Sequence, residues 1–272
     1  MDVRVNKTLI YLYCATKTKP PLSNFDAMGV KIYPIYSQGI YAIASSVSAN
    51  EFSKDNLEKN LANMKWLEEK ALLHEKVIEE LMKDMTAIPF KFPTIFQSEE
   101  NVEKLLKTHN AEFKNMMTEL EGKEEWGCKI YCDTDNFDRH VREGDESIKK
   151  IDEEVISSNK GKAYFLKKKK EELIEDVMNK KISEYTKDSF DRLSKASVKT
   201  KINKLLPKEV TQKKENMVFN GAFLINKKRM GEFNNVLDYL KTKYADKGLI
   251  FECTGPWPPY NFCSAAKENI NG

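Results

Sequence analysis

A long stretch of the chain, between Gly161 and Pro207, contains neither glycine nor proline, the residues that most often end a helix. Lysine and glutamate dominate its composition. Apolar side chains nevertheless recur in it at helical spacing, at Ile174, Met178, Ile182 and Tyr185. These features predict a long helix or a helical hairpin, interrupted near residues 194–200.

A second stretch without glycine or proline runs from Asn56 to Met85. Its apolar residues step by three or four and trace one stripe, which consists of Leu57, Leu61, Met64, Leu67, Ala71, His74, Ile78, Met82 and Met85. This spacing predicts one unbroken amphipathic helix. We expect the helix to pack its stripe, with His74 inside, against a sheet in the N-terminal half.

Runs rich in β-branched and aromatic residues surround this helix and a second one. The second helix is predicted from Ser98, a good N-cap followed by two glutamates, to about Leu120, where Gly122 ends it. The strand-like runs are residues 7–14, 30–33, 39–44, 87–96 and 125–133. The alternation of strands with two long helices predicts an α+β domain over residues 1–133, with a ferredoxin-like antiparallel sheet and helices on one face.

The remaining residues, 134–272, predict a second domain that is helix-rich, belongs to the α+β class and contains a small sheet. They include a strand–helix–strand unit at Asn216–Asn226, Met230–Tyr244 and Gly248–Thr254. A chain of 272 residues has room for two domains, since one domain usually takes about 100–200 residues. The fold class expected for the whole chain is therefore α+β with two domains.

The charge of this chain gives it no strong attraction to a polyanion. Its 45 basic residues nearly balance its 42 acidic ones, for a net charge of +3, so we expect neither nucleic acid nor a lipid membrane as a partner. The run Lys167–Lys170 resembles a nucleic-acid patch. Glu171 and Glu172 follow it directly, however, and Lys–Glu pairs one turn apart favour a solvated helix face. No segment approaches the ~20 apolar residues of a membrane span.

Five cysteines, an odd number spread widely, do not predict a disulfide framework, and we expect a cytoplasmic protein. Cys128 and Cys132 lie on one predicted strand and share a face, with their positions about 13 Å apart, too far to hold one metal. Small core hydrophobic residues are the favoured interpretation of both. Cys253 and Cys263 flank the proline-rich tail.

His74-Glu75 begins a zinc-protease motif that requires a second histidine one turn later, where this chain has Ile78. Because His74 also lies in the apolar stripe, a hydrogen-bonded core histidine is the favoured interpretation. None of the three histidines belongs to a motif that would activate a cysteine nucleophile. We therefore predict no catalytic residue, no metal and no cofactor.

The tail contains the most unusual segment of the sequence, Thr254–Phe262, in which three prolines surround a tryptophan. Proline fixes φ and favours an extended segment that displays Trp257 and Tyr260 on its sides. These rings either cover an open face of the C-terminal domain or dock a partner, since Trp and Tyr dominate binding hot spots. The candidate partner-binding residues are Trp257, Tyr260 and Phe262.

This tail segment resembles the C-terminal motif of the gas vesicle protein F/L family. Other blocks are similar to the family in the same order along the chain: Trp66-Leu67, His74-Glu75, Pro89–Phe96, Glu125–Lys129, Gly161–Leu166 and Asn220–Ile225. Lys91 and Pro93 depart from the family pattern, in which an arginine and a small residue are common there. The resemblance extends from residue 7 to residue 262.

The resemblance implies a cytoplasmic, gas vesicle-associated accessory protein that acts in the assembly of a gas-filled protein shell. It also implies contacts with the small hydrophobic shell protein and other accessory proteins, and no enzymatic activity. Unassembled shell subunits expose apolar surface that aggregates unless it is shielded, and strand addition at a sheet edge beside an apolar groove is a plausible mode of binding them. The alternatives are a small-molecule enzyme that uses Cys or His in a cleft and a weak nucleic-acid binder.

Overall fold

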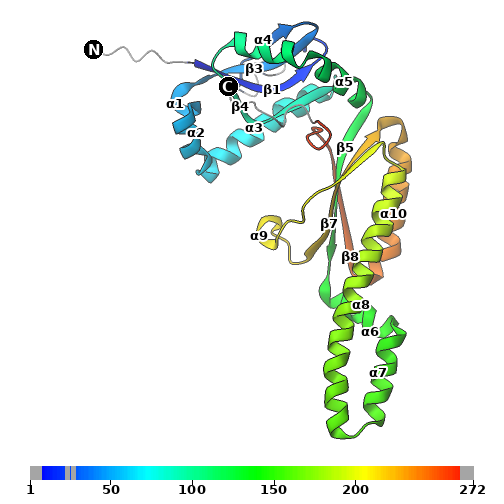
Figure 1. Ribbon diagram of the computed structural model, residues 1–272. Helices are drawn as coiled ribbons and strands as arrows, with labels where there is room; N and C mark the ends of the chain where they lie inside the picture. Colours follow the sequence, from blue (N-terminus) through cyan, green and yellow to red (C-terminus); the bar gives the residue numbers. More distant parts are fainter. Residues whose placement is uncertain (1–7, 22–24, 26–28, 264–272) are drawn as a thin grey trace. The chain divides into compact units, whose positions relative to one another are not determined.

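The structure, a computed structural model, describes residues 8–21, 25 and 29–263. The chain divides into two compact units (Figure 1): unit 1 runs to Glu124 and resumes at Trp257, and unit 2 comprises Glu125–Pro256. The sequence-based boundary lies after residue 133, whereas this division falls inside a strand, and the tail returns to unit 1. Because that strand is continuous, its residues carry no turn or linker signal that would mark the boundary.

Unit 1 is built on a four-stranded antiparallel sheet. Its strands are β1 (Thr8–Thr16), β2 (Ile32–Ser37), β3 (Ile40–Ser48) and β4 (Ala87–Phe96), in the order β2-β3-β1-β4. All residues of β1 except the first are buried, as expected for a continuous apolar run in the centre of a sheet. In the β2–β3 hairpin the two loop residues, Gln38 and Gly39, have φ of 48° and 86°, the positive values that a two-residue hairpin loop requires.

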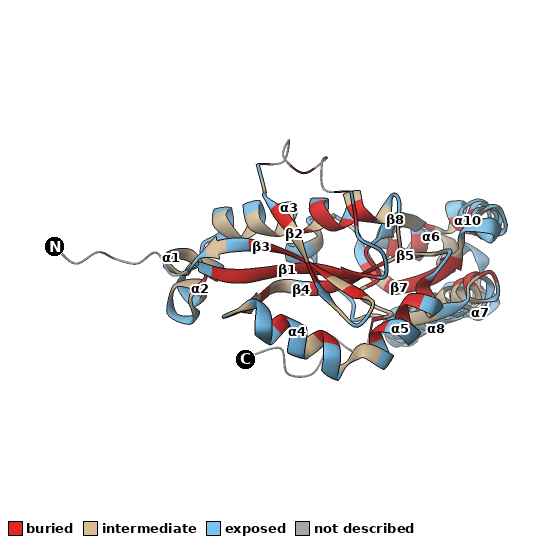
Figure 2. Cartoon of the chain, turned by 90° about the horizontal axis from the view of Figure 1, so that it is seen from above, coloured by how far each residue is buried: buried red, intermediate tan, exposed pale blue. Residues whose placement is uncertain are grey.

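Helices cover both faces of this sheet (Figure 2). The helices after β3 are α1 (Ala49–Phe52), α2 (Lys54–Leu61) and α3 (Met64–Met82); those after β4 are α4 (Glu99–Thr108) and α5 (Asn110–Leu120), which meet at His109. Figure 2 shows α3 on one face and α4 on the other. The prediction of helices on one face was wrong. An amphipathic stripe shows that a helix packs on a sheet, but it does not specify which face the helix covers.

The helix predicted over residues 56–85 is interrupted between α2 and α3. The side-chain oxygen of Asn63 accepts a hydrogen bond from the backbone amide of Trp66 (3.3 Å), so Asn63 is the N-cap of a new helix. The prediction of one unbroken helix was therefore wrong. The later part of the stripe is the most completely buried: Met64 is 74% exposed, whereas His74 is 1% exposed, as predicted, and Leu57 packs against the core while only partly buried.

Unit 2 contains a second four-stranded sheet, in which the strand order is β6-β7-β5-β8. Its strands are β5 (Lys123–Cys132), β6 (Lys199–Ile202), β7 (Asn216–Asn226) and β8 (Leu249–Trp257). The helices α6 (Thr134–Gly144), α7 (Glu146–Ser157) and α8 (Lys160–Lys195) connect β5 to β6, α9 (Lys208–Thr211) precedes β7, and α10 (Met230–Tyr244) connects β7 to β8. This is the βαββαβ connectivity of a ferredoxin-like fold.

The two sheets have the same strand order when each is counted along the chain: second, third, first, fourth. They differ in the first connection, because the residues described between β1 and β2 contain no helix, whereas three helices lie between β5 and β6. The predicted fold class, α+β with two domains that each contain a sheet, is confirmed.

The helix α7 and the first part of α8 form an arm of unit 2 that extends beyond its sheet (Figure 1), and the rest of α8 packs against the sheet. α8 has 36 residues and therefore spans about 54 Å at 1.5 Å per residue. It confirms the long helix predicted for this segment, and it ends at Lys195, inside the region where an interruption is predicted.

The core of unit 2 contains Cys128, which is 1% exposed, as expected for a core residue. Its sulfur is nevertheless bonded to that of Cys253, and the two Cα atoms are 4.1 Å apart. The expectation that the cysteines form no disulfide is thus wrong for this pair. The two residues are 125 positions apart and meet because β5 and β8 are neighbouring strands, which no local spacing announces.

Candidate partner-binding surfaces

The proline-rich tail places its three candidate residues in different surroundings. Trp257 is the last residue of β8 and is 41% exposed. Tyr260 packs against the core of unit 1, and its hydroxyl donates a hydrogen bond to Glu75 Oε1 at 2.8 Å. Phe262 is half-buried. The tail thus covers its own molecule through Tyr260, on unit 1 rather than on the C-terminal domain, while Trp257 presents part of its ring at the surface.

The contact between Tyr260 and Glu75 lies at the margin of an apolar core. Burial raises the pKa of Glu75, and the hydrogen bond from the Tyr260 hydroxyl opposes this effect by stabilising the carboxylate. Burial also raises the pKa of Tyr260, and the neighbouring carboxylate raises it further. A charge-assisted hydrogen bond of this kind holds the tail at one position on α3.

His74, the residue before Glu75, is engaged through both ring nitrogens. Nε2 lies 3.0 Å from the carbonyl oxygen of Phe90, which only accepts, so Nε2 carries the proton. Nδ1 therefore accepts from the hydroxyl of Tyr11 at 2.8 Å. Burial lowers the pKa of His74 to about 4. The prediction of a hydrogen-bonded core histidine is confirmed.

A pocket of about 510 Å³ opens beside this histidine in unit 1. Its lining is mostly aromatic and hydroxyl-bearing, with Tyr13, Tyr33, Phe52 and Ser45 among its residues. The polar groups pair with one another: the hydroxyls of Tyr13 and Ser45 are 3.1 Å apart, and Lys70 Nζ lies 3.1 Å from Glu51 Oε1. Such a lining fits an apolar side chain of a partner better than a reacting substrate.

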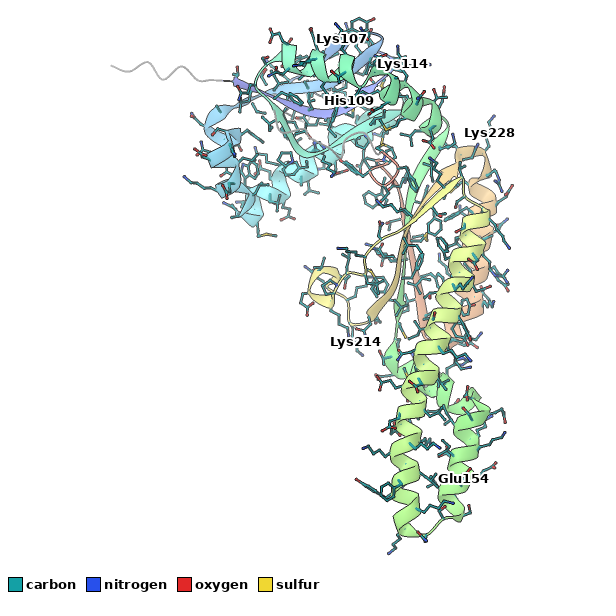
Figure 3. All side chains as sticks on the ribbon, viewed as in Figure 1. Lys107, His109, Lys114, Glu154, Lys214 and Lys228 are labelled. Atoms are coloured by element: carbon teal, nitrogen blue, oxygen red, sulfur yellow. A yellow bond between two sulfur atoms is a disulfide. The ribbon has the colours of Figure 1, made fainter. Side chains whose placement is uncertain are left out.

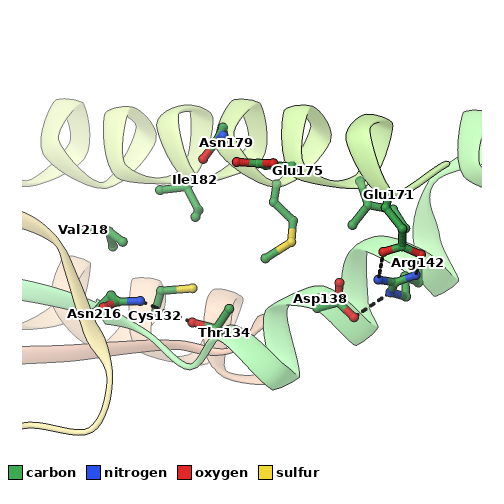
Figure 4. A pocket seen from close by; sticks show the side chains of 12 residues that line it. Cys132, Thr134, Asp138, Arg142, Glu171, Glu175, Asn179, Ile182, Asn216 and Val218 are labelled. Atoms are coloured by element: carbon green, nitrogen blue, oxygen red, sulfur yellow. Dashed lines mark hydrogen bonds and ion pairs between the residues drawn. The ribbon is translucent and has the colours of Figure 1, made fainter. Parts of the chain in front are cut away.

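A second pocket, of about 360 Å³, lies in unit 2 between α8, α6 and the sheet (Figure 4). Arg142 at one end donates to both carboxylate oxygens of Glu171, at 2.8 and 3.2 Å, and to Asp138 at 2.6 Å. The contact with Glu171 joins α6 to α8, whereas the contact with Asp138 lies within α6. The other end is lined by Ile182 and Val218 together with the amides of Asn179 and Asn216. Cys132 also lines the pocket, and burial raises the pKa of its thiol to about 11.

The edge of the second sheet exposes a series of apolar side chains. β6 pairs with β7 and forms one edge of the sheet. Residues 198–210, which include β6 and the segment after it, carry four large apolar side chains at the surface: Val198 (46% exposed), Ile202 (62%), Leu205 (54%) and Val210 (62%). We call these four residues the β6 patch. It was missed in the sequence, although Val198, Thr200 and Ile202 alternate with two lysines, the period of a strand.

Cys14, Cys128 and His74 are structural residues of the two cores. Cys14 is fully buried, and burial raises the pKa of its thiol, so the thiolate is disfavoured. Cys128 is held in the disulfide and both nitrogens of His74 are engaged. Within the described ranges, no three His, Cys, Asp or Glu side chains converge on a metal site, and no helix is long and apolar enough to cross a bilayer.

Comparison with known proteins identifies relatives over almost the whole chain. Residues 9–264 match the family model described as gas vesicle synthesis protein GvpL/GvpF. The chain is 21% identical over 266 residues to gas vesicle protein L of Streptomyces sp. (strain CB03234), a match that covers 97% of this chain and 96% of the relative. It is 22% identical over 256 residues to gas vesicle protein F of Microcystis aeruginosa (strain PCC 7806), covering 93% and 97%.

Two solved structures are similar in fold. The crystal structure of GvpF from Anabaena sp. PCC7120 superposes with a TM-score of 0.70 at 19% identity, covering 94% of this chain and 98% of that one. The crystal structure of GvpF from Microcystis aeruginosa gives a TM-score of 0.64, also at 19% identity, covering 94% and 99%. The similarity covers both units.

Proposed function

The chain belongs to the gas vesicle synthesis protein GvpL/GvpF family, and from that premise we propose that it binds the small hydrophobic shell protein before assembly and delivers it to the growing shell. A shell that holds gas presents apolar surface, and such surface aggregates in water unless another protein covers it. The protein that covers it must itself offer an apolar surface that is open in the free state. The location that we expect is the cytoplasm, in association with gas vesicles.

The β6 patch is the observation that supports this proposal most directly. Soluble proteins expose single apolar side chains often, but four within one short segment beside a sheet edge are typical of a protein-binding surface. An edge strand also has backbone N–H and C=O groups on its outer side that a partner strand can pair with. We infer that a strand of the shell protein adds to β6 while its apolar side chains pack against the patch.

The sequence of β6 favours selective strand pairing over self-association. Lys199 and Lys201 alternate with Thr200 and Ile202 along the strand. Lysines on an edge strand suppress pairing between identical chains, because their charges repel one another in the paired sheet.

The tail contributes a second proposed contact. Trp257 stands at the end of β8, the opposite edge of the sheet from β6, with part of its ring exposed. We assign partner contact to Trp257 and assign Tyr260 and Phe262 to holding the tail on unit 1. Contacts with other accessory proteins of gas vesicle assembly are part of the same proposal.

Co-expression with the shell protein tests the role of the β6 patch. The wild type should keep the shell protein soluble and co-purify with it. The Ile202→Asp variant places a charge in the patch and should leave most of the shell protein in the insoluble fraction. Leu72→Asp, at a residue on α3 that is 51% exposed, is the matched control and should behave as the wild type. Equal co-purification of the shell protein with the Ile202→Asp variant and the wild type would refute the proposed site.

A further inference from the structure

The turn between α7 and α8 carries three large apolar side chains that the described part of unit 2 leaves largely uncovered. Ile156, at the end of α7, is 85% exposed, and Tyr164 and Phe165, near the start of α8, are 70% and 72% exposed. The rings of Tyr164 and Phe165 lie edge to face with centroids 5.9 Å apart. We call these three residues the tip cluster. Aromatic residues exposed in this way contribute strongly to binding when a partner buries them.

The turn that presents the tip cluster is well defined. Asn159 is the N-cap of α8, and its side-chain oxygen accepts from the backbone amide of Lys162 at 3.0 Å. The hydroxyl of Ser158 donates to the carbonyl oxygen of Glu154 at 2.7 Å, which satisfies one of the last carbonyls of α7. Figure 3 labels Glu154 on α7 near this turn. Because the turn is already fixed, little conformational entropy is lost when a partner binds it.

Lysines surround the tip cluster. Residues 160–170 contain six lysines and no acidic residue, namely Lys160, Lys162, Lys167, Lys168, Lys169 and Lys170. Lys170 forms an ion pair with Asp152 at 2.5 Å, whereas the other five form none with any residue that the structure describes. Glu171, which the sequence pattern pairs with Lys167, binds Arg142 instead.

The five unpaired lysines do not stabilise α8 through ion pairs. The N-terminal turn of a helix carries a partial positive charge and favours acidic side chains, but the first turn of α8 has none. Lys160 and Lys162, in this first turn, are therefore unfavourable beside the helix dipole, and the five unpaired lysines repel one another. Their presence beside an exposed apolar cluster is explained if an anionic surface binds there.

We propose that the tip cluster is a docking site for an acidic protein, whose apolar pocket receives Phe165 and Tyr164 and whose carboxylates contact the surrounding lysines. Ile156 is aliphatic and cannot stack on a base, so it favours an apolar protein pocket over nucleic acid. Asp152, Glu153 and Glu154 at the end of α7 would repel a continuous polyanion or an anionic bilayer. A protein can avoid that repulsion by placing its carboxylates only over α8. This site is separate from the β6 patch. It rests on the accessory-protein contacts proposed above and deepens that proposal by giving their place and their chemistry.

Binding assays with the full-length protein test the proposal. The probes are the other gas vesicle accessory proteins with net negative charge, each purified singly and measured by biolayer interferometry. At least one of these proteins should bind the wild type, and the Phe165→Ser variant should bind it with a Kd that is about tenfold higher or more. A variant with Glu at positions 167, 168 and 169 should weaken binding similarly and reduce its dependence on salt between about 0.05 and 0.5 M.

Matched controls separate this site from general effects. Met64→Ser removes an apolar side chain of equal exposure from unit 1 and should leave the Kd unchanged. Circular dichroism should show the same melting temperature for all variants, since the substituted residues are exposed. The proposal is overturned if no acidic accessory protein binds, if Phe165→Ser binds with the wild-type Kd, or if the tip instead binds phosphatidylglycerol vesicles or single-stranded DNA in a Phe165-dependent way. Failure of the Ile202→Asp test would refute the β6 proposal and leave this one standing.

Discussion

The two sheets of this protein share a strand order but differ in how completely they are covered. In unit 1 the central strand β1 is buried along almost its whole length, and helices cover both faces of the sheet. In unit 2 the first crossover contains the three helices α6 to α8, and the exposed β6 patch lies along the short edge strand β6 and the segments that flank it. The same connectivity therefore supports a sheet covered on both faces in one unit and an edge with exposed apolar side chains, our proposed binding edge, in the other.

The two units also fix their cores by different chemistry. Unit 1 encloses a buried hydrogen-bond network. Tyr11 donates a hydrogen bond to His74, and His74 donates one to the backbone carbonyl of Phe90. Unit 2 has a covalent link between β5 and β8, made by Cys128 and Cys253. Substitutions in these two places should therefore destabilise the units separately.

The largest loss of stability is expected when the buried hydrogen-bond network of unit 1 is broken. His74→Ala removes a fully enclosed ring and leaves the hydroxyl of Tyr11 and the carbonyl of Phe90 without their partner, so unit 1 should lose about 4 kcal/mol of stability. Hydrogen exchange of the β1 amides measures this loss. His109→Ala, at a surface histidine whose contact is with Glu112, should cost less than about 0.5 kcal/mol. If the β1 amides of the His74→Ala variant exchanged at the wild-type rate, His74 would not stabilise the core of unit 1, and the prediction would be wrong.

The disulfide should have the next largest effect, and only on unit 2. A Cys128→Ala, Cys253→Ala double variant frees a loop of more than a hundred residues in the unfolded chain, and unit 2 should lose about 3 kcal/mol. Hydrogen exchange of the β7 amides should become faster while that of β1 stays the same. Cys132→Ala is the control for loss of a buried thiol. Detection of two free thiols at Cys128 and Cys253 by mass spectrometry in the air-oxidised protein would contradict the pairing.

The pH dependence of unit 1 should follow His74. Its folded pKa of about 4 lies below the ordinary value of 6.5, so the unfolded state binds more protons as the pH falls. The stability that comes from keeping His74 neutral is fully present above pH 6.5 and is lost progressively toward pH 4. Between pH 7 and pH 5 the loss should be about 2 kcal/mol. Denaturant melts of the wild type and His74→Gln should diverge in this range; parallel curves would show that the ring is not buried and neutral.

The smallest effect is expected at the tail. Tyr260→Phe keeps the ring but removes the hydroxyl that donates to Glu75, and unit 1 should lose about 1 kcal/mol. The same variant should raise the pKa of Glu75 further, since the hydrogen bond that stabilises its carboxylate is gone. Differential scanning calorimetry measures the first change and carbon NMR titration of Glu75 the second. An unshifted Glu75 titration would show that the tail does not dock there.

Periodicity in the sequence predicted the parts of the fold in which one long pattern dominates. The apolar run of β1, the helix α8 and the burial of His74 all follow from spacing over many residues. The interruption at Asn63 escaped prediction because one side chain that caps the helix outweighs a stripe that continues past it. Local cap chemistry and long-range periodicity compete, and periodicity alone does not show which prevails.

The candidate sites were harder to predict from the sequence than the fold was, because they depend on contacts between residues that are far apart in the chain. Tyr260 and Glu75 are 185 positions apart, and nothing near Tyr260 in the sequence specifies that partner. The β6 strand is only four residues long, too short for its alternation to stand out after a long helix. Of the tip cluster, only Tyr164 and Phe165 lie in a block singled out in the sequence, Gly161–Leu166, and hydrophobicity alone does not show that these side chains are exposed at a turn between two helices.

Site-specific photo-crosslinking tests the central claim, that the open edge of unit 2 receives the shell protein, most directly. A photoreactive phenylalanine analogue is placed at position 202 in the β6 patch or, for comparison, at position 36, where Tyr36 on β2 is exposed on the edge strand of the sheet in unit 1. Irradiation in cells that produce the shell protein should yield a crosslinked product of chain plus shell subunit from position 202 and little from position 36. Crosslinks to the shell protein from position 36 with none from position 202 would contradict the account.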